Sequence, residues 1–467
     1  AWQQNFAGGT GSRPCDIGII KFSPTGAKLY ATYLGGAGNE LPQSLIVSSS
    51  NELFVFGTTG SSDFATTHNA FSREFKGGPL ISILRNGITF TEGTDMFITR
   101  FSENGNNLLA SSLIGGTSND GLNTANQLRY NYADEARGGI VIDQNNNIII
   151  ACSTTSTDFP VPGNGYQPEF GGGTQDGMIV KFNENLSSVF WGTYLGGSAP
   201  DGIFTLAIDR YANVYVAGGT TSTDFPTSSN AHQTSNAGGQ SDGFISVIRA
   251  NGQELLSSTY YGSDLYDQIY LLSLDRQNRV YVYGQTEKGG TFYQSNFNFQ
   301  ENNGKQYISM FTNNLEERTW STTFGRGLAK PDITPTAFTV DICGQIFVAG
   351  WGGSSNSAPD GSTFGGTTGL TITDDAFQTT TDNNDFYLMV LDEQEQSLIY
   401  ASFFGGATSS EHVDGGTSRF DRRGVMHQAV CAGCGGRDDF PTTPGVWSNI
   451  NGTVSYTHLT LPTNREV

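Results

Sequence analysis

The sequence is poor in cysteine, in charged residues and in long apolar runs. Five cysteines in 467 residues are too few to build a disulfide scaffold, and their odd number leaves at least one thiol without a partner in the chain. No apolar run is long enough to cross a bilayer, so we expect no membrane insertion. Only 15% of the residues are charged, and the net charge of −20 disfavours binding to nucleic acid or to anionic lipid.

Glycine and aromatic residues are abundant instead. The 61 glycines, 31 phenylalanines and 19 tyrosines favour short strands joined by tight turns. A repeated unit organises them, and its clearest mark is the phrase TTSTDFP at 154–160 and again at 220–226. Each unit opens with an alternating strand, continues with a strand that ends in glycine, and then forms a hairpin through an Asp/Asn/Gly turn. Six units begin near residues 16, 95, 176, 242, 306 and 385.

Four strands in each unit predict an all-β fold, a β-propeller of four-stranded blades with six repeats present and seven in the intact ring. A parallel β-helix is the main competitor, but its coils are much shorter than these units. The TTSTDFP phrase predicts a loop that leaves the last strand of a blade. Its Asp158, Phe159, Asp224 and Phe225 are expected to anchor this loop, with the aromatic rings between blades.

The units also resemble a known repeat family. The third unit contains DGMIVKF, WGTYLGG, DRYANVYVAGG and TTSTDFPT in that order. This order resembles the SBBP-type β-propeller repeat, and the likeness extends over roughly residues 16–451. Residues 411–447 are more specific, because they resemble the last repeats of gliding-motility-associated surface proteins that carry a type IX sorting domain. The resemblance implies a secreted or cell-surface protein, and it assigns no catalytic residue.

Both ends of the chain depart from the repeat. Residues 1–15 resemble the end of a preceding repeat, so we expect the propeller to occupy 16–453. Residues 454–467 resemble translated sequencing-adaptor DNA and are left out of the fold. A signal region and a sorting region are both missing, which predicts a fragment of a larger multidomain protein.

Cys431 and Cys434 form the most conspicuous motif, CAGC. A redox pair would need a helix N-terminus to lower a thiol pKa, and no helical period follows. A zinc site would need further ligands, which the other cysteines and His427 supply only from distant units. A local or blade-linking disulfide is therefore the favoured interpretation.

A weak calcium candidate lies in the hairpin sequence DQNNN. Asp143, Asn145 and Asn147 place oxygen ligands at alternate positions, as calcium loops do, but the glycine and distal glutamate of an EF-hand are missing. The equivalent sequences DRYAN and DRQNR lack this spacing. An ordinary hairpin turn is the favoured interpretation.

Other acidic residues recur at fixed places in the repeat. The acids that open most units could line an acidic ring, but their recurrence favours a structural hydrogen-bonding role. These acids are Asp95, Asp176, Asp242 and Asp385. His412 and Asp414 form the only close pair of a histidine and an acid outside the strands, and a solvated loop is favoured over catalysis there.

Two main hypotheses about function follow. The leading one is a non-catalytic extracellular β-propeller that acts as an adhesion, interaction or spacer module, with an extracellular protein or glycan as partner and no cofactor. It rests on the repeats, the acidic balance and the lack of a P-loop, HExxH or nucleophile-elbow motif. The alternative is a propeller enzyme, a polysaccharide lyase or hydrolase, with its site at the central opening. A third hypothesis, a calcium-stiffened stalk, would use bound calcium.

Overall fold

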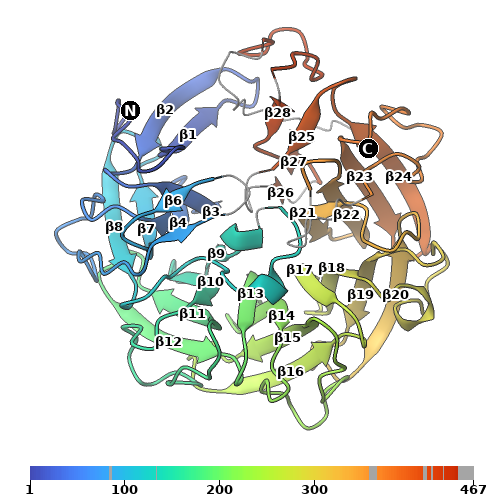
Figure 1. Cartoon of the computed structure of the whole chain (residues 1–467), viewed down its shortest axis with the longest axis horizontal. Coiled ribbons are helices and arrows are strands. Elements are labelled where there is room, and N and C mark those ends of the chain that lie inside the picture. The colour runs from blue at the N-terminus through green and yellow to red at the C-terminus, as the bar shows by residue number, and fades with distance from the viewer. Residues whose placement is uncertain are drawn as a thin grey trace.

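The chain forms a ring of antiparallel sheets that radiate from a central axis, as Figure 1 shows. The computed structural model describes residues 1–83, 87–132, 134–356, 365–413, 418–421, 424–434 and 436–450. Five four-stranded sheets lie within this part, which confirms the predicted all-β propeller. No described helix is long and apolar enough to cross a membrane.

The four strands of each blade follow one another along the chain, from the axis outward (Figure 1). Blade 1 contains β3 (Glu40–Val47), β4 (Leu53–Thr59), β7 (Asp95–Phe101) and β8 (Leu108–Ile114). Blade 2 contains β9 (Gly139–Ile142), β10 (Ile148–Thr154), β11 (Asp176–Phe182) and β12 (Val189–Leu195). Blade 3 contains β13 (Asp201–Ile208), β14 (Val214–Thr220), β15 (Asp242–Ile248) and β16 (Leu255–Tyr261). Blade 4 contains β17 (Asp267–Leu274), β18 (Val280–Thr286), β19 (Gln306–Phe311) and β20 (Arg318–Phe324). Blade 5 contains β21 (Thr334–Val340), β22 (Gln345–Trp351), β23 (Phe386–Asp392) and β24 (Ser397–Phe404).

Two-stranded sheets occupy the rest of the ring, between blade 5 and blade 1 (Figure 1). They pair β1 (Ile17–Phe22) with β2 (Lys28–Leu34), β25 (Ser410–His412) with β28 (Cys431–Cys434), and β26 (Arg419–Phe420) with β27 (Met426–His427). A small hairpin, β5 (Ile81–Ser82) with β6 (Thr89–Phe90), lies within the long loop of blade 1. The Trp447 ring lies 6.2 Å from the Phe22 ring, so the segment after β28 reaches the N-terminal hairpin.

The blades begin at a different point from the repeat seen in the sequence. Each blade starts with the hairpin, so five of the six predicted unit starts fall at or next to the third strand of a blade, and the sixth lies next to β1. The prediction that TTSTDFP leaves the last strand is wrong: Thr154 ends β10, and the loop returns to β11 of the same blade. The chain passes to the next blade at the glycine-rich turn after the outer strand. The sequence period fixes the length of a repeat but not where a blade begins.

The core consists of apolar side chains on the facing surfaces of adjacent blades. Every residue of β10, β14 and β18 is buried, which explains why apolar residues stand at consecutive positions in these strands. Phe159 packs in the cluster that joins blade 1 to blade 2, and Phe225 packs in the cluster between blades 2 and 3. Both rings therefore lie between blades.

Candidate functional sites at the blade junctions and the axis

The TTSTDFP residues hydrogen-bond to the turn through which the chain enters the same blade. We call this set of bonds the clamp, and the loop that carries the TTSTDFP residues the clamp loop. In blade 2, the Thr154 and Ser156 hydroxyls donate to the carboxylate of Asp120, the latter over 2.9 Å. The Asp158 carboxylate accepts the backbone N–H of Thr117 at 2.9 Å. These bonds join the start of a long loop to the crossover from blade 1, residues 115–120.

The second copy of the phrase repeats this geometry at the next junction. The Ser222 hydroxyl donates to Asp201 at 2.9 Å, and Asp224 accepts the backbone N–H of Ser198 at 2.8 Å. The Phe225 N–H donates to the Tyr260 hydroxyl at 2.8 Å. Because the accepted N–H groups favour the charged form, the pKa values of Asp158 and Asp224 are lowered. The phrase recurs because each blade junction needs the same clamp.

The four unit-opening acids are buried at the third strand of their blades, away from the innermost strands that surround the axis (Figure 1). Asp176 accepts the Gly171 N–H at 2.5 Å, and Asp242 accepts the Ala237 N–H at 2.6 Å. Asp95 accepts the N–H groups of residues 76 and 77, at 2.7 and 3.1 Å, and Asp385 accepts the side-chain amide of Gln378 at 3.4 Å. Each of these acids holds its own loop.

A second buried acid, which we did not predict, lies beside each of them. It follows the glycine-rich turn, and its carboxylate accepts an N–H from that turn, as Asp201 does from Gly197 at 2.7 Å. Burial raises the pKa of Asp201 to about 7, and it also raises that of the neighbouring Asp176 to about 7. The sequence signal is an acid four or five residues after the second residue of the turn. These second acids are Glu40, Asp120, Asp201, Asp267 and Glu411.

A long insertion fills the axis of the ring. The connection from β8 to β9 runs over 115–138, whereas that from β12 to β13 covers only 196–200. It carries two short helices, η1 (Asn126–Leu128) and η2 (Asp134–Ala136), which lie near the centre of the ring (Figure 1). We call residues 121–132 and 134–138 the axial segment.

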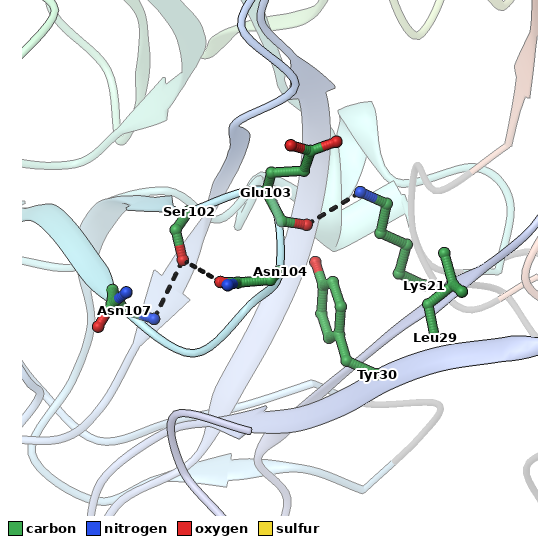
Figure 2. Close-up of a pocket in the computed structure, with 7 residues that line it drawn as sticks. All are labelled: Lys21, Leu29, Tyr30, Ser102, Glu103, Asn104 and Asn107. Atoms are coloured by element: carbon green, nitrogen blue, oxygen red, sulfur yellow. Dashed lines mark hydrogen bonds between the residues drawn. The ribbon is translucent and has the colours of Figure 1, made fainter.

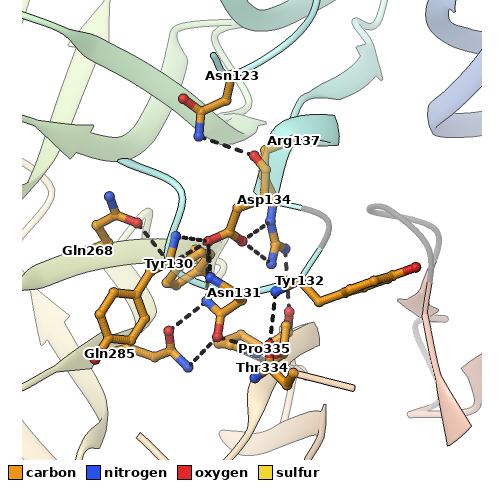
Figure 3. Close-up of polar contacts among 12 residues, drawn as sticks. Asn123, Tyr130, Asn131, Tyr132, Asp134, Arg137, Gln268, Gln285, Thr334 and Pro335 are labelled. Carbon is orange, nitrogen blue, oxygen red and sulfur yellow. Dashed lines mark hydrogen bonds and ion pairs between the residues drawn. The ribbon is translucent and has the colours of Figure 1, made fainter. Parts of the chain in front are cut away.

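Asp134 is the hub of the axial segment (Figure 3). Its Oδ1 accepts from the Arg137 guanidinium at 2.9 and 3.1 Å, and its Oδ2 accepts the Asn131 N–H at 2.6 Å and the Tyr270 hydroxyl at 3.0 Å. The Arg137 guanidinium also lies 4.8 Å from the centre of the Tyr270 ring. The buried charge is therefore both paired and hydrogen-bonded, as a stable buried ion pair requires.

The axial segment is bonded to the first two strands of blade 4 and to the first strand of blade 5 (Figure 3). The Asn131 side-chain amide donates to Gln285 of β18 at 2.7 Å, and the Thr334 hydroxyl of β21 donates to Asn131 at 3.2 Å. The Arg137 guanidinium donates to the backbone oxygen of Pro335 at 3.4 Å. One insertion from the junction of blades 1 and 2 is thus bonded to blades 4 and 5. Its only sequence signal is the long spacing before residue 139.

A cavity of about 380 Å³ lies at the edge of the ring, between the β1–β2 hairpin and the turn from β7 to β8 (Figure 2). Lys21 crosses it and donates to the backbone oxygen of Glu103 at 2.9 Å. The lining residues are Lys21, Leu29, Tyr30, Ser102, Glu103, Asn104 and Asn107. This mixture of one aromatic ring with amides and charges is compatible with a polar ligand such as a sugar.

The histidine and cysteine candidates lie in the last part of the ring. His412 is buried in β25, with its ring 5.0 Å from that of Tyr132 and 5.6 Å from that of Trp351. The expectation of a solvated loop is therefore wrong for His412, because its ring packs against these aromatic rings within a strand. Asp414 lies outside the described residues, so its pairing with His412 stays a prediction. Cys431 and Cys434 both belong to β28, but the side chain of Cys434 is not described, and their disulfide also stays a prediction.

The calcium candidate forms a hairpin turn. Asp143 Oδ1 accepts the N–H groups of Asn145 and Asn147 at 2.8 and 2.9 Å, and Oδ2 accepts the Asn147 side-chain amide and pairs with Lys181 at 2.8 Å. Asp209 accepts the same set of bonds in the hairpin of blade 3, without a lysine. Within the described ranges, no three His, Cys, Asp or Glu side chains are placed to share a metal ion.

We therefore expect removal of divalent metal to leave stability unchanged. The Lys181 ammonium already neutralises the Asp143 carboxylate, so a calcium ion there would have to displace it. The measurement is the melting temperature with and without about 1 mM EDTA. A fall of several degrees, restored by added calcium, would support the calcium-stiffened stalk instead.

Four-stranded antiparallel sheets arranged radially around a central axis define a β-propeller. Residues 191–226, from the outer strand of blade 2 through the clamp loop of blade 3, match the family described as SBBP, Beta-propeller repeat. None of the curated proteins matches the chain.

Solved structures share the architecture at very low identity. The Dos1 propeller is 8% identical with a TM-score of 0.39, over 90% of this chain and 71% of that one. The NanB sialidase from Streptococcus pneumoniae is 8% identical with a TM-score of 0.41, over 85% of this chain and 65% of that one. The Hadza microbial sialidase Hz136 is 8% identical with a TM-score of 0.39, and the match covers 83% of this chain but only 62% of the sialidase. Likenesses this distant carry no argument about activity.

Proposed function

We propose that the protein is a non-catalytic β-propeller that acts as an interaction or spacer module of a larger secreted or cell-surface protein. The observation that carries this proposal is the axial segment. The alternative enzyme would keep its site at the central opening, but there the Asp134–Arg137 pair is buried and bonded to Tyr270, Asn131 and Pro335. Groups already bonded to one another are poorly placed to bind substrate.

Extracellular location is part of this proposal and draws on the likeness of residues 411–447 to gliding-motility-associated, type IX-secreted surface proteins. The net charge of −20 is compatible with a solvent-exposed role and unfavourable for binding to nucleic acid. Adhesion through a protein or glycan partner would use the rim of the ring. The cavity beside Tyr30 lies there (Figure 2).

The proposal is tested by screening the full chain against extracellular polysaccharides and matrix proteins, for both binding and turnover. We expect binding without turnover, or neither if the module is only a spacer. Tyr30→Ala should weaken any glycan binding at the rim recess, whereas Tyr211→Ala, on an exposed ring in the blade 3 hairpin, is the matched control. Polysaccharide cleavage that His412→Ala abolishes would replace the proposal with the lyase or hydrolase alternative.

A further inference from the structure

Blade junctions bury two carboxyl groups on the same side of a glycine. At the junction of blades 2 and 3, Asp176 Oδ1 and Asp201 Oδ2 lie 2.4 and 2.8 Å from the point where a Cβ on Gly196 would stand. Asp242 and Asp267 are likewise both buried at the junction of blades 3 and 4, where burial, and then the charge of Asp267, raise the pKa of Asp242. The same arrangement around a glycine recurs for Asp16 with Glu40, Asp95 with Asp120, and Asp385 with Glu411.

One oxygen of the unit-opening acid lacks a donor in most of these pairs. The backbone N–H of Gly171 satisfies Asp176 Oδ2, but Asp176 Oδ1 is buried without a hydrogen-bond partner. The Oδ1 atoms of Asp16, Asp242 and Asp385 share this state. A buried carboxylate oxygen without a donor is costly, and two buried negative charges side by side add repulsion. A proton on either carboxyl would remove both costs.

The junction of blades 4 and 5 has only one acid at the position where the other junctions have a pair. Gln306, which is uncharged, stands where the other units have the opening acid. The second acid, Asp332, is paired there with the Arg326 guanidinium at 2.7 Å. Where one carboxyl is replaced by an amide, the remaining one is balanced by a cation.

We infer that each buried acid pair holds one shared proton at neutral pH, so that the pairs form a set of proton-dependent latches between successive blades. Oxygens of Asp16 and Glu40 both lie 2.5 Å from the Cβ position of Gly35, and oxygens of Asp385 and Glu411 lie 2.0 and 2.6 Å from that of Gly405. The first acid of a pair holds the loop of its own blade, and the second holds the incoming turn and the clamp. Loss of the proton leaves two negative charges side by side, one on the acid that holds the loop and one on the acid that holds the incoming turn.

The pair Asp176–Asp201 is the cleanest to test. Burial, and then the charge of Asp201, raise the pKa of Asp176 to about 7, well above its ordinary value of 3.8. The titratable groups that face the pair are Asp224, on the loop after β14, Tyr194, on the outer strand of blade 2, and Tyr260, on the outer strand of blade 3. A carboxyl whose pKa is raised by folding stabilises the fold fully below about pH 4 and loses this contribution as the pH rises through 7.

The experiment measures the melting temperature of the full chain from pH 5 to pH 8.5 at fixed ionic strength. We expect the melting temperature of the wild type to fall by roughly 5–10 °C over this range. Asp176→Asn keeps the shape of the side chain and supplies a permanent donor toward Asp201. It should lose less stability than the wild type between pH 5 and pH 7, where the folded wild type retains a proton that the unfolded chain has already released.

Asp224→Asn is the matched control, because Asp224 belongs to the same junction but has a lowered pKa. It should leave the slope between pH 5 and pH 7 the same as in the wild type. Equal slopes for the wild type and Asp176→Asn would overturn the inference, as would stabilisation of the wild type by added calcium at pH 8.5, which would place a metal ion in the pair. If Asp176→Asn does not fold, Asp242→Asn repeats the test. The infrared carbonyl band of protonated carboxyl groups in the wild type at pH 7 is a direct readout, and its absence would also contradict the inference.

Discussion

Arg137→Met is expected to lower the free energy of unfolding by about 3–5 kcal/mol, because it leaves the buried Asp134 carboxylate without its cation. Both side chains lie at the axis, with 7% and 0% of their surfaces exposed, so water does not replace the lost partner. The substitution also removes the bond to the backbone of Pro335 in blade 5. Urea denaturation of the full chain, followed by intrinsic fluorescence, measures the effect.

A second variant distinguishes the destabilisation caused by the unpaired charge from that caused by the lost packing of the arginine. Asp134→Asn combined with Arg137→Met removes both charges, so we expect it to be more stable than Arg137→Met alone. Arg249→Met is the control for a surface pair, since Arg249 and Glu254 are 47% and 55% exposed, and it should leave the urea midpoint nearly unchanged. Similar losses for Arg137→Met and Arg249→Met would mean that the axial segment does not hold the blades together.

The repeat was readable from the sequence because it reflects local structure. The hairpin turns, the buried strands and the anchoring phenylalanines Phe159 and Phe225 all follow from short-range patterns of turn residues and apolar residues. The same patterns gave a wrong starting point for the blade. A tandem repeat reads identically whichever strand is taken as the first, and only pairing between strands distinguishes the possibilities.

The polar sites were not predictable, because they depend on contacts between distant segments. Asp176 and Asp201 are 25 residues apart and belong to different blades, so their pairing appears only once the ring is formed. The bond between Asn131 and Gln285 spans 154 residues. The axial segment itself has no repeat counterpart, and nothing in its composition distinguishes a filled axis from an exposed loop.

Gly218→Ala is expected to destabilise the protein by about 3 kcal/mol, at the upper end of the range for overpacked sites. A Cβ on Gly218 would stand 1.9 Å from the backbone oxygen of Gly202, which is part of the neighbouring strand. The register of β13 against β14 shifts between Ile203 and Thr205, directly beside this position. The bulge turns a backbone carbonyl toward the glycine, so only a shift of the inner strand could make room.

The same glycine recurs opposite a register shift in three other blades, at Gly57, Gly284 and Gly350. Their Cβ positions would lie 2.2, 2.4 and 2.8 Å from a backbone oxygen of the inner strand. Gly18→Ala is the control, because Gly18 also lies in a strand but has no atom within 4 Å of its Cβ position, and we expect a change of less than about 1 kcal/mol. Both variants are compared by their urea midpoints. Equal midpoints would show that the inner strand moves to make room for the methyl group. A loss of stability at Gly218 alone would identify the bulge as the reason that the second strand of the hairpin has glycine at this position.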